Sequence, residues 1–236
     1  MDREKMALLD ELNYFHRNYK QITYGVITKI MNKISLLSSY DDMAEVALKL
    51  ARVSNYISDP SLLSEIIKYL STLLDNVMTK EATSNMLEAL CIAYYSIGFD
   101  YKVVEYGLKY ANSDYVSSKD LYNVYNRIAI SCFEIEEYGK ALDYLEKSNE
   151  EFYKYHSMMT TQEIFAKYTS QVVLYHINKA MFFVFLNDTK YARIEMAKYN
   201  QVYEEHGSLE FKESYKMIIA FYNIYLEFMI GNDREK

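Results

Sequence analysis

Two stretches of the sequence have the same pattern of large and small residues, and this repetition limits the fold more than any other feature. In residues 87–111, apolar residues recur three or four positions apart, stop at Gly98 and then resume. Residues 125–148 repeat the pattern, with the interruption at residues 136–139. Such spacing predicts an amphipathic helix, and a glycine that tolerates left-handed φ ends one. Each stretch is therefore predicted to be a helical hairpin.

The composition argues against the main alternative, a sheet of many strands. The 236 residues include only 6 glycines and 1 proline, so the chain lacks the turn residues that such a sheet requires. The fold class is therefore predicted to be all-α. A chain of this length can form one repeat array or two small domains, and we expect one continuous array over residues 1–236.

The repeated residues resemble the tetratricopeptide repeat. In that family the first helix carries a bulky residue, a large residue followed by a small one, and an aromatic; a turn like Gly-Asp-Tyr follows, and the second helix carries Ala, an aromatic or Leu, and Ala. The first copy matches at Leu87, Leu90-Cys91, Tyr94, Gly98, Asp100-Tyr101, Val104, Leu108 and Ala111, with Phe99 as an extra turn residue. The second copy matches at Tyr125, Ile128-Ala129, Glu137-Tyr138, Ala141, Leu145 and Ser148. The resemblance implies a right-handed superhelix of antiparallel helical hairpins.

Two further copies match less completely. The third matches at Ala180, Phe183, Leu186, Asn187-Asp188, Ala192, Met196 and Tyr199, but His176 and Lys179 stand where apolar residues are expected. The fourth has Phe221, Ile224-Tyr225 and Phe228, followed by a predicted turn at residues 231–233. The predicted repeats are 84–113, 122–153, 173–203 and an incomplete 214–236, with divergent or capping hairpins in 5–78. Because the copies are spaced more widely than the roughly 34 residues of a regular repeat, helices of about 25 residues are expected at the start of copies three and four.

The sequence contains no recognisable arrangement of residues for catalysis. It lacks a glycine-rich phosphate loop, a paired-cysteine or paired-histidine metal spacing and a strand-borne nucleophile motif. Cys91 and Cys132 lie on apolar stripes and are expected to be small buried residues. We therefore predict no catalytic residues, no metal ligands and no cofactor, and the chain itself is predicted not to be an enzyme.

Charge and hydropathy limit the partners and the location. The net charge is −7 and neither Lys nor Arg forms a run, so nucleic acid is not an expected partner. The longest purely apolar run, residues 180–186, is far shorter than the roughly 20 residues of a membrane-spanning helix, so no membrane insertion is expected. The two cysteines cannot build a disulfide framework, and the N-terminus lacks the pattern of a secretory signal. These features favour a cytoplasmic protein.

The strongest functional signal lies on the first helix of each hairpin, in residues that point away from its packing stripe. In a curved stack of hairpins the first helices line the concave side, so these residues converge on one groove. An asparagine amide can pair with any peptide unit, and Arg127 can bind a carboxylate bidentately. The alternative is that each asparagine is only a tolerated polar residue on a wet helix face. The predicted groove residues are Asn85, Tyr95, Asn123, Asn126, Arg127, Phe133 and Asn178.

Three functions are consistent with the sequence. The first is a non-catalytic module whose concave groove holds a peptide or protein segment, as the resemblance implies. The second is a sensory or dimerisation region that precedes a signalling enzyme such as a diguanylate cyclase, an organisation that bacterial proteins with similar arrays often have. It is motivated by the apolar face of Phe221, Ile224 and Phe228, which an incomplete last repeat would leave partly uncovered. The third is a scaffold that self-associates, for instance as a homodimer.

Overall fold

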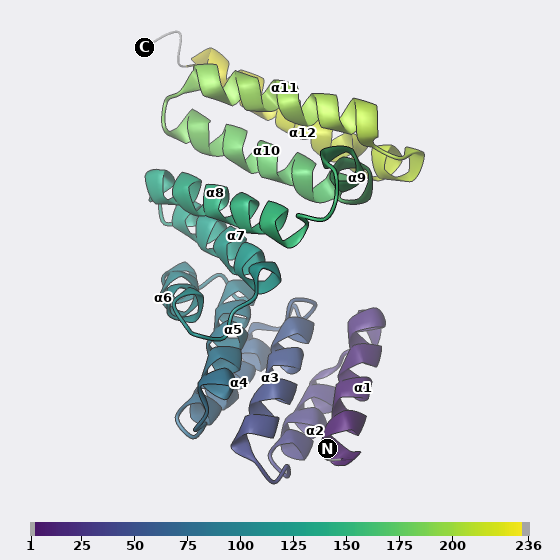
Figure 1. Cartoon of the computed structure of the whole chain (residues 1–236), viewed down its shortest axis with the longest axis vertical. Coiled ribbons are helices and arrows are strands. Elements are labelled where there is room, and N and C mark those ends of the chain that lie inside the picture. Colours follow the sequence, from purple (N-terminus) through teal and green to yellow (C-terminus); the bar gives the residue numbers. More distant parts are fainter. Residues whose placement is uncertain (1–2, 233–236) are drawn as a thin grey trace. The chain divides into compact units, whose positions relative to one another are not determined.

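The chain is built from helices throughout the part that the structure describes. The computed structural model describes residues 3–232, and no strand occurs among them. They form two compact units, Met1–Ile135 (unit 1) and Glu136–Lys236 (unit 2), which are described separately below. Figure 1 shows the helices of each unit packed beside one another. The predicted all-α fold class is confirmed.

Unit 1 contains three helical hairpins and the helix that follows them. Its elements are α1 (Arg3–Arg17), the short 3-10 helix η1 (Tyr19–Gln21), α2 (Tyr24–Ile34), α3 (Tyr40–Ser54), α4 (Pro60–Leu74), α5 (Lys80–Ser96), α6 (Asp100–Ala111) and α7 (Ser118–Glu134). Most of the α-helices begin at a polar side chain that accepts hydrogen bonds from first-turn backbone N–H groups. These N-cap residues are Thr23, Ser39, Asp59, Thr79 and Ser117.

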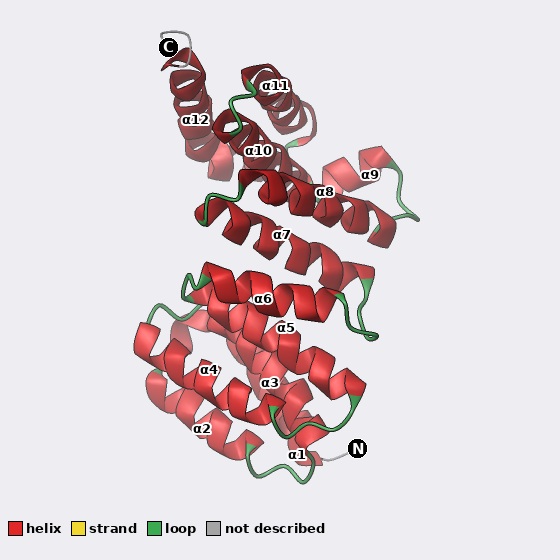
Figure 2. Ribbon diagram, turned by 90° about the vertical axis from the view of Figure 1, so that its left-hand side faces the viewer, coloured by secondary structure: helices red, strands yellow, loops and turns green. Residues whose placement is uncertain are grey.

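The helices of unit 1 form two layers. Figure 2 shows α2, α4 and α6 in front of α1, α3 and α5, and α3 packs directly against both α1 and α5. Small side chains at the contact let α3 and α5 approach closely. They are Ala44, Ala47 and Ala51 on α3 and Ala82, Ala89 and Ala93 on α5, each buried. Residues 5–78, which match the repeat poorly in sequence, therefore stack as hairpins on the first well-matched repeat.

The turns of the first three predicted repeats share one backbone feature. Gly98 has a φ of 72°, Glu136 of 64° and Asn187 of 58°, and in each case a helix begins two residues later. At Gly98 the amide of Phe99 donates to the carbonyl of Tyr94, five residues back (3.1 Å). This hydrogen bond is typical of a helix that ends in a Schellman motif. Glu136 and Asn187 thus adopt the conformation that the sequence pattern assigns to glycine.

This common geometry corrects the register predicted for the first repeat. Because the three turns have the same length, Phe99 is not an extra residue, and the buried positions of α6 lie one residue earlier than expected. They are Val103, Gly107 and Tyr110 in place of Val104, Leu108 and Ala111. The inner residues predicted for the second repeat, Ala141, Leu145 and Ser148, and for the third, Ala192, Met196 and Tyr199, are buried as expected.

Unit 2 is arranged around α10. Its helices are α8 (Tyr138–Tyr155), α9 (Thr161–Lys167), α10 (Thr169–Phe185), α11 (Thr189–His206) and α12 (Leu209–Asn232). α10 contacts each of the other four. The prediction of a long helix at the start of the third repeat is wrong. The helical segment is interrupted at Tyr168, which separates the short α9 from the 17-residue α10. At the fourth repeat the expectation is confirmed, since α12 has 24 residues.

The last predicted turn is also partly wrong. Residues 231 and 232 continue α12, and Asp233 lies outside the described residues.

The close packing of α6 on α7 gives a test of the corrected register. A Cβ atom at Gly107 would lie 2.8 Å from Cγ1 and 2.9 Å from Cδ1 of Ile128, so Gly107→Ala forces Ile128 to move. We expect a loss of up to about 2 kcal/mol in the free energy of unfolding, since overpacking costs about 1–3 kcal/mol and the gain in helix propensity offsets about 1 kcal/mol of this. The measurement is denaturant unfolding followed by circular dichroism.

The matched control is Gly25→Ala on α2, where a Cβ atom would meet nothing within 4 Å. This change should leave stability equal or raise it by up to about 1 kcal/mol. Equal effects of the two substitutions would contradict the packing described for Gly107.

Candidate functional site

Four of the predicted groove residues lie around one pocket in unit 1. The pocket has a volume of about 440 Å³ and lies where the C-terminal ends of α3 and α5 meet the middle of α7. We call it the amide pocket, and its lining residues are Asn55, Tyr95, Ser96, Asn123, Asn126 and Arg127. Three asparagine amides and one guanidinium thus face a common space, which suits the binding of a polar ligand.

Arg127 is the only cation in this lining. Its guanidinium lies over the ring of Tyr95, with Cζ 5.9 Å from the ring centroid, a cation–π arrangement. Burial raises the pKa of the Tyr95 hydroxyl, so this residue stays neutral. The Nη1 atom of Arg127 is buried and has no hydrogen-bond partner among the described residues. A buried donor in this state is costly unless a ligand or water satisfies it.

Asn55 and Ser96 were not predicted from the sequence. Ser96 Oγ donates to Asn55 Oδ1 at 3.0 Å and lies 3.4 Å from Ser54 Oγ, so these residues join the ends of α3 and α5. Asn55 belongs to residues 5–78, where no clear repeat motif pointed to an inner face. The one local signal for Asn55 in the sequence was its position at the end of an apolar helical stretch, shortly before Pro60.

An ion-pair network connects the three inner helices beside this pocket. Arg52 Nη2 on α3 lies 3.0 Å from Glu88 Oε1 on α5 and 3.5 Å from Asp120 Oδ1 on α7. Glu88 is only 5% exposed. Burial raises the pKa of its carboxyl group, while the nearby Arg52 opposes this shift. Glu88 therefore holds helices together and is not free to bind a ligand.

A group of cations without carboxylate partners adjoins the network. Arg17 on α1, Lys49 on α3 and Lys119 on α7, here called the cationic patch, form no ion pair within the described residues. Desolvation, together with the charges of Arg52, Arg17 and Lys119, lowers the pKa of Lys49. Desolvation and the charges of Lys49, Arg52 and Arg17 likewise lower the pKa of His16. The patch is therefore locally positive in a chain whose net charge is −7.

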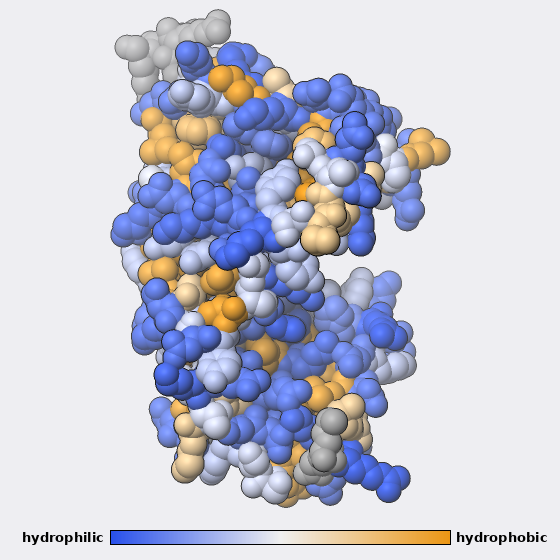
Figure 3. Space-filling model, in the orientation of Figure 1, coloured by the Kyte–Doolittle hydropathy of each residue, from blue (hydrophilic) through white to orange (hydrophobic). Residues whose placement is uncertain are grey.

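The patch and the amide pocket are continuous. Lys119 and Asn123 lie one turn apart on α7, and the Asn123 side-chain amide donates to the Lys119 carbonyl at 2.9 Å. Asn55 in turn lies one turn after Arg52 on α3 and donates to its carbonyl at 3.4 Å. On the lower half of the face shown in Figure 3, polar surface surrounds small, separate apolar patches. The amide pocket and the cationic patch therefore present mainly polar groups.

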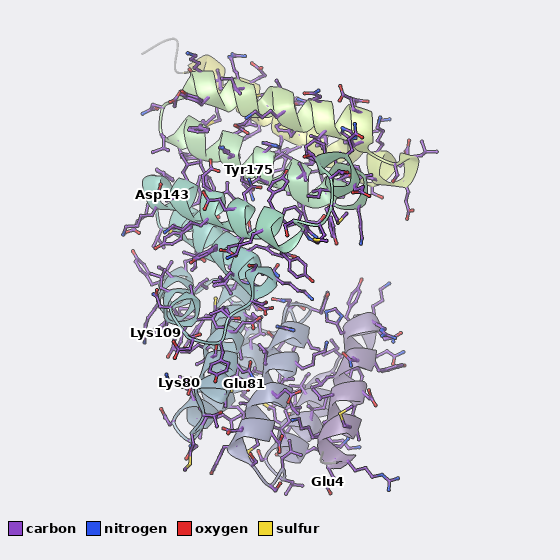
Figure 4. All side chains as sticks on the ribbon, in the orientation of Figure 1. Glu4, Lys80, Glu81, Lys109, Asp143 and Tyr175 are labelled. Atoms are coloured by element: carbon purple, nitrogen blue, oxygen red, sulfur yellow. The ribbon has the colours of Figure 1, made fainter. Side chains whose placement is uncertain are left out.

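A second pocket contains Asn85 but is electrostatically different. It also measures about 440 Å³ and lies at the N-terminal ends of α3 and α5, where Figure 4 labels Lys80 and Glu81. Lys5 contacts both Asp42 (2.6 Å) and Glu45 (2.5 Å), and Lys80 pairs with Asp114 outside the lining (2.6 Å). Asn85 is therefore separated from the amide pocket, in a lining where carboxylates outnumber ammonium groups.

The remaining predicted residues do not join the amide pocket. Phe133 is half-buried near the end of α7 and is not part of the lining, and Asn178 is half-buried on α10 in unit 2. Cys91 and Cys132 are buried as expected, and burial raises the pKa of the Cys91 thiol to about 12, which makes it a poor nucleophile at neutral pH. Within residues 3–232, no three His, Cys, Asp or Glu side chains are arranged to hold a metal ion.

His176 and Lys179, the unexpected polar residues of the third repeat, are part of a buried network in unit 2. His176 Nδ1 lies 2.6 Å from Oε2 of Glu195 on α11, and Lys179 lies 2.5 Å from Glu146 on α8. Tyr175, labelled in Figure 4 between α8 and α10, donates to Glu146 at 2.7 Å. Glu195 is 3% exposed and is also 2.9 Å from Lys198. The network pairs each buried charge, so we assign it a structural role.

Comparison with known proteins supports the fold. One solved structure, described as MamA AMB-1 C2221, superposes with a TM-score of 0.52 over 85% of this chain and 99% of its own, at 13% sequence identity. At this identity the likeness concerns the fold alone, and it supports a helical array similar to tetratricopeptide repeats. No family model and no curated protein matches the sequence. No helix within residues 3–232 has the length and apolar character needed to cross a membrane.

The Glu195 network predicts a pH dependence of stability. Burial raises the pKa of Glu195, but hydrogen bonds from His176 and Lys198 and the charge of Lys179 outweigh it and lower the pKa to about 2. A carboxylate with a lowered pKa stabilises the fold above its unfolded pKa, and this contribution is lost as the pH falls from about 4.5 towards 2. We expect Glu195→Gln to lower the free energy of unfolding at pH 7 by on the order of 2–3 kcal/mol.

Urea unfolding at several pH values measures this difference between Glu195→Gln and the wild type. The difference should shrink as the pH falls from about 4.5 towards 2, because the carboxyl group of the unfolded wild type becomes protonated in this range while that of the folded wild type stays ionised until about pH 2. The control is Glu150→Gln at an exposed position of α8, which should change stability little at any pH. A difference that stays constant from neutral to acidic pH would show that the charge of Glu195 is not what matters.

Proposed function

We propose that this chain is a non-catalytic protein-binding module that holds a segment of a partner protein in the amide pocket and the cationic patch of unit 1. The observation that carries the proposal is a pocket of amides in which the buried Nη1 of Arg127 has no hydrogen-bond partner among the described residues. The cationic patch next to it likewise forms no ion pair within residues 3–232. Binding of an extended segment needs no chemistry from the chain, in agreement with the absence of catalytic motifs from the sequence.

The lining of the amide pocket suits a peptide backbone. The side chain of Asn126 makes no hydrogen bond to another described residue, so both its carbonyl oxygen and its amide group remain available. A peptide unit presents one donor and one acceptor, which a single carboxamide can satisfy together. This type of recognition is independent of the ligand's side chains and would leave specificity to neighbouring groups.

The cationic patch indicates which side chains the ligand carries. Arg17, Lys49 and Lys119 repel one another in the free protein, and a ligand with several carboxylates would relieve that repulsion. Arg127 could form a charge-assisted hydrogen bond to one of these carboxylates through its free Nη1. We therefore propose an acidic segment as the ligand, with the chain's net negative charge disfavouring non-specific binding of acidic proteins elsewhere on its surface.

Three substitutions in the amide pocket test the binding site. Asn123→Ala, Asn126→Ala and Arg127→Ala together should weaken binding of a fluorescently labelled peptide of alternating acidic and small residues at least tenfold, because a hydrogen bond to a charged group contributes about 1.5–3 kcal/mol. Fluorescence anisotropy measures the affinity, and circular dichroism verifies that helicity is retained. The control variant combines Lys29→Ala, Asn32→Ala and Asn112→Ala, all exposed and outside the pocket. Unchanged binding by the pocket variant would remove this site from consideration.

Charge reversal in the patch tests the acidic nature of the ligand. Lys49→Glu with Lys119→Glu should abolish the preference for the acidic peptide over neutral and basic peptides of the same length, since carboxylates would now face carboxylates. Lys29→Glu with Lys68→Glu makes the same change in net charge at exposed positions of α2 and α4 and should retain the preference. In the wild type, added salt should weaken binding of the acidic peptide. An equal loss in both variants would mean that only the total charge of the protein matters.

A further inference from the structure

Helix α12 has apolar side chains on two opposite faces. Ile219, Leu226 and Ile230 are at most 5% exposed and pack into unit 2. The opposite face carries Met217 (79% exposed), Phe221 (59%), Ile224 (73%) and Phe228 (63%), which we call the outer stripe. Figure 2 shows α12 at the edge of unit 2, with α10 and α11 on one side of it. A helix that is apolar all around is normally covered on both faces.

Polar contacts fix the rotation of α12, so the outer stripe cannot turn inward. Asn223 on α12 and Asn200 on α11 exchange side-chain hydrogen bonds of 2.9 and 3.1 Å, and the hydroxyl of the buried Tyr199 donates to Asn223 Oδ1 at 2.5 Å. Arg193 on α11 adds an ion pair to Glu227 at 2.9 Å. Rotating the helix would break this set and leave buried polar groups unpaired. The exposure of the outer stripe is therefore built into unit 2.

The outer stripe is large enough to form an interface. Four side chains of this size and exposure present on the order of 500 Å² of apolar surface, which is near the upper end of what a monomeric protein exposes in one patch. Two copies of the stripe facing each other would bury about 1,000 Å² in total, the area at which specific interfaces begin. Because the patch runs along one regular helix, a second helix packed along it could cover all of it.

The spacing of the outer stripe matches a second copy of itself. Its residues are separated by four, three and four positions, a series that reads the same in both directions and follows a coiled-coil seam. We propose that two copies of this chain associate through α12 in an antiparallel arrangement with two-fold symmetry. Met217 then packs against Phe228 of the second copy, and Phe221 against Ile224 of the second copy. Every residue of the stripe is covered by this single contact.

The charge distribution is compatible with this arrangement. Residues 217–226 contain no charged side chain, so no like charges meet near the two-fold axis. The first charge after them, Glu227, is paired with Arg193 of its own unit. Tyr225 would face Ala220 of the second copy, where a small residue leaves room for the ring. The interface would combine a fully apolar centre with charges only at its ends, as specific interfaces usually do.

Sedimentation equilibrium of the full chain over a series of concentrations tests the association. The wild type should dimerise, and Phe221→Glu should shift the protein to monomer, because two carboxylates would be placed in an apolar contact. The matched control is Leu36→Glu, which introduces the same charge at a leucine of unit 1 that is 79% exposed, and it should leave the dimer unchanged. A wild type that stays monomeric at the highest soluble concentration would overturn the proposal and point to another chain or another segment as the occupant.

Two designed pairs test the antiparallel register. Adding Ile224→Lys to Phe221→Glu should restore the dimer, because each introduced carboxylate then faces the introduced ammonium group of the other copy.

Mixing the single variants Phe221→Cys and Ile224→Cys under mild oxidation should give mainly the mixed disulfide. The native Cys91 and Cys132 are buried and should not interfere. Disulfides formed only between two Phe221→Cys chains would overturn the antiparallel arrangement. Loss of peptide binding in unit 1 has no bearing on this result, so the two proposals fail independently.

Discussion

In the first three predicted repeats, the register of the second helix depends on one turn residue whose backbone is left-handed. At Gly98, Glu136 and Asn187 the first helix ends in this conformation and the next helix starts two residues later, so the positions that become buried follow at fixed distances. Glycine and asparagine adopt the conformation readily, whereas at Glu136 it costs about 1 kcal/mol. The constraint therefore lies in the backbone geometry of the turn, and the residue type that supplies it varies.

Within unit 1, some charged side chains of the inner helices pair with one another, and others remain available to a ligand. Arg52 neutralises the buried Glu88 and also contacts Asp120, which joins α3, α5 and α7. Both nearby carboxylates pair with Arg52, and the cations around them form no ion pair with any residue that the structure describes. The same network that stabilises the stack thus leaves its surface positive beside the amide pocket. This link between stability and surface charge is the physical basis for the proposed preference for acidic ligands.

The sequence predicted the all-α class and most helix positions because apolar periodicity and capping residues are local signals. Tyr95, Asn123, Asn126 and Arg127 were recognised as facing away from the packing stripe for the same reason, and they meet around one pocket. Whether they bind a partner stays a prediction. The one-residue error in α6 arose because Asp100-Tyr101 imitates the motif of the turn, and only the backbone dihedral angles reveal that Phe99 is not an insertion.

Other features depend on contacts between segments that are distant in sequence. Asn55 and Lys49 belong to a stretch without a clear motif, and their role follows from the stacking of α3 on α5. His176 and Lys179 weakened the third repeat in the sequence because their partners, Glu195 and Glu146, lie on other helices. The outer stripe of α12 shows the reverse situation, since the sequence already predicted a partly uncovered apolar face at Phe221, Ile224 and Phe228. What the sequence does not show is how α12 is anchored, and the contacts of Asn223 and Glu227 with α11 help to hold this face outward, where it is available to a second molecule.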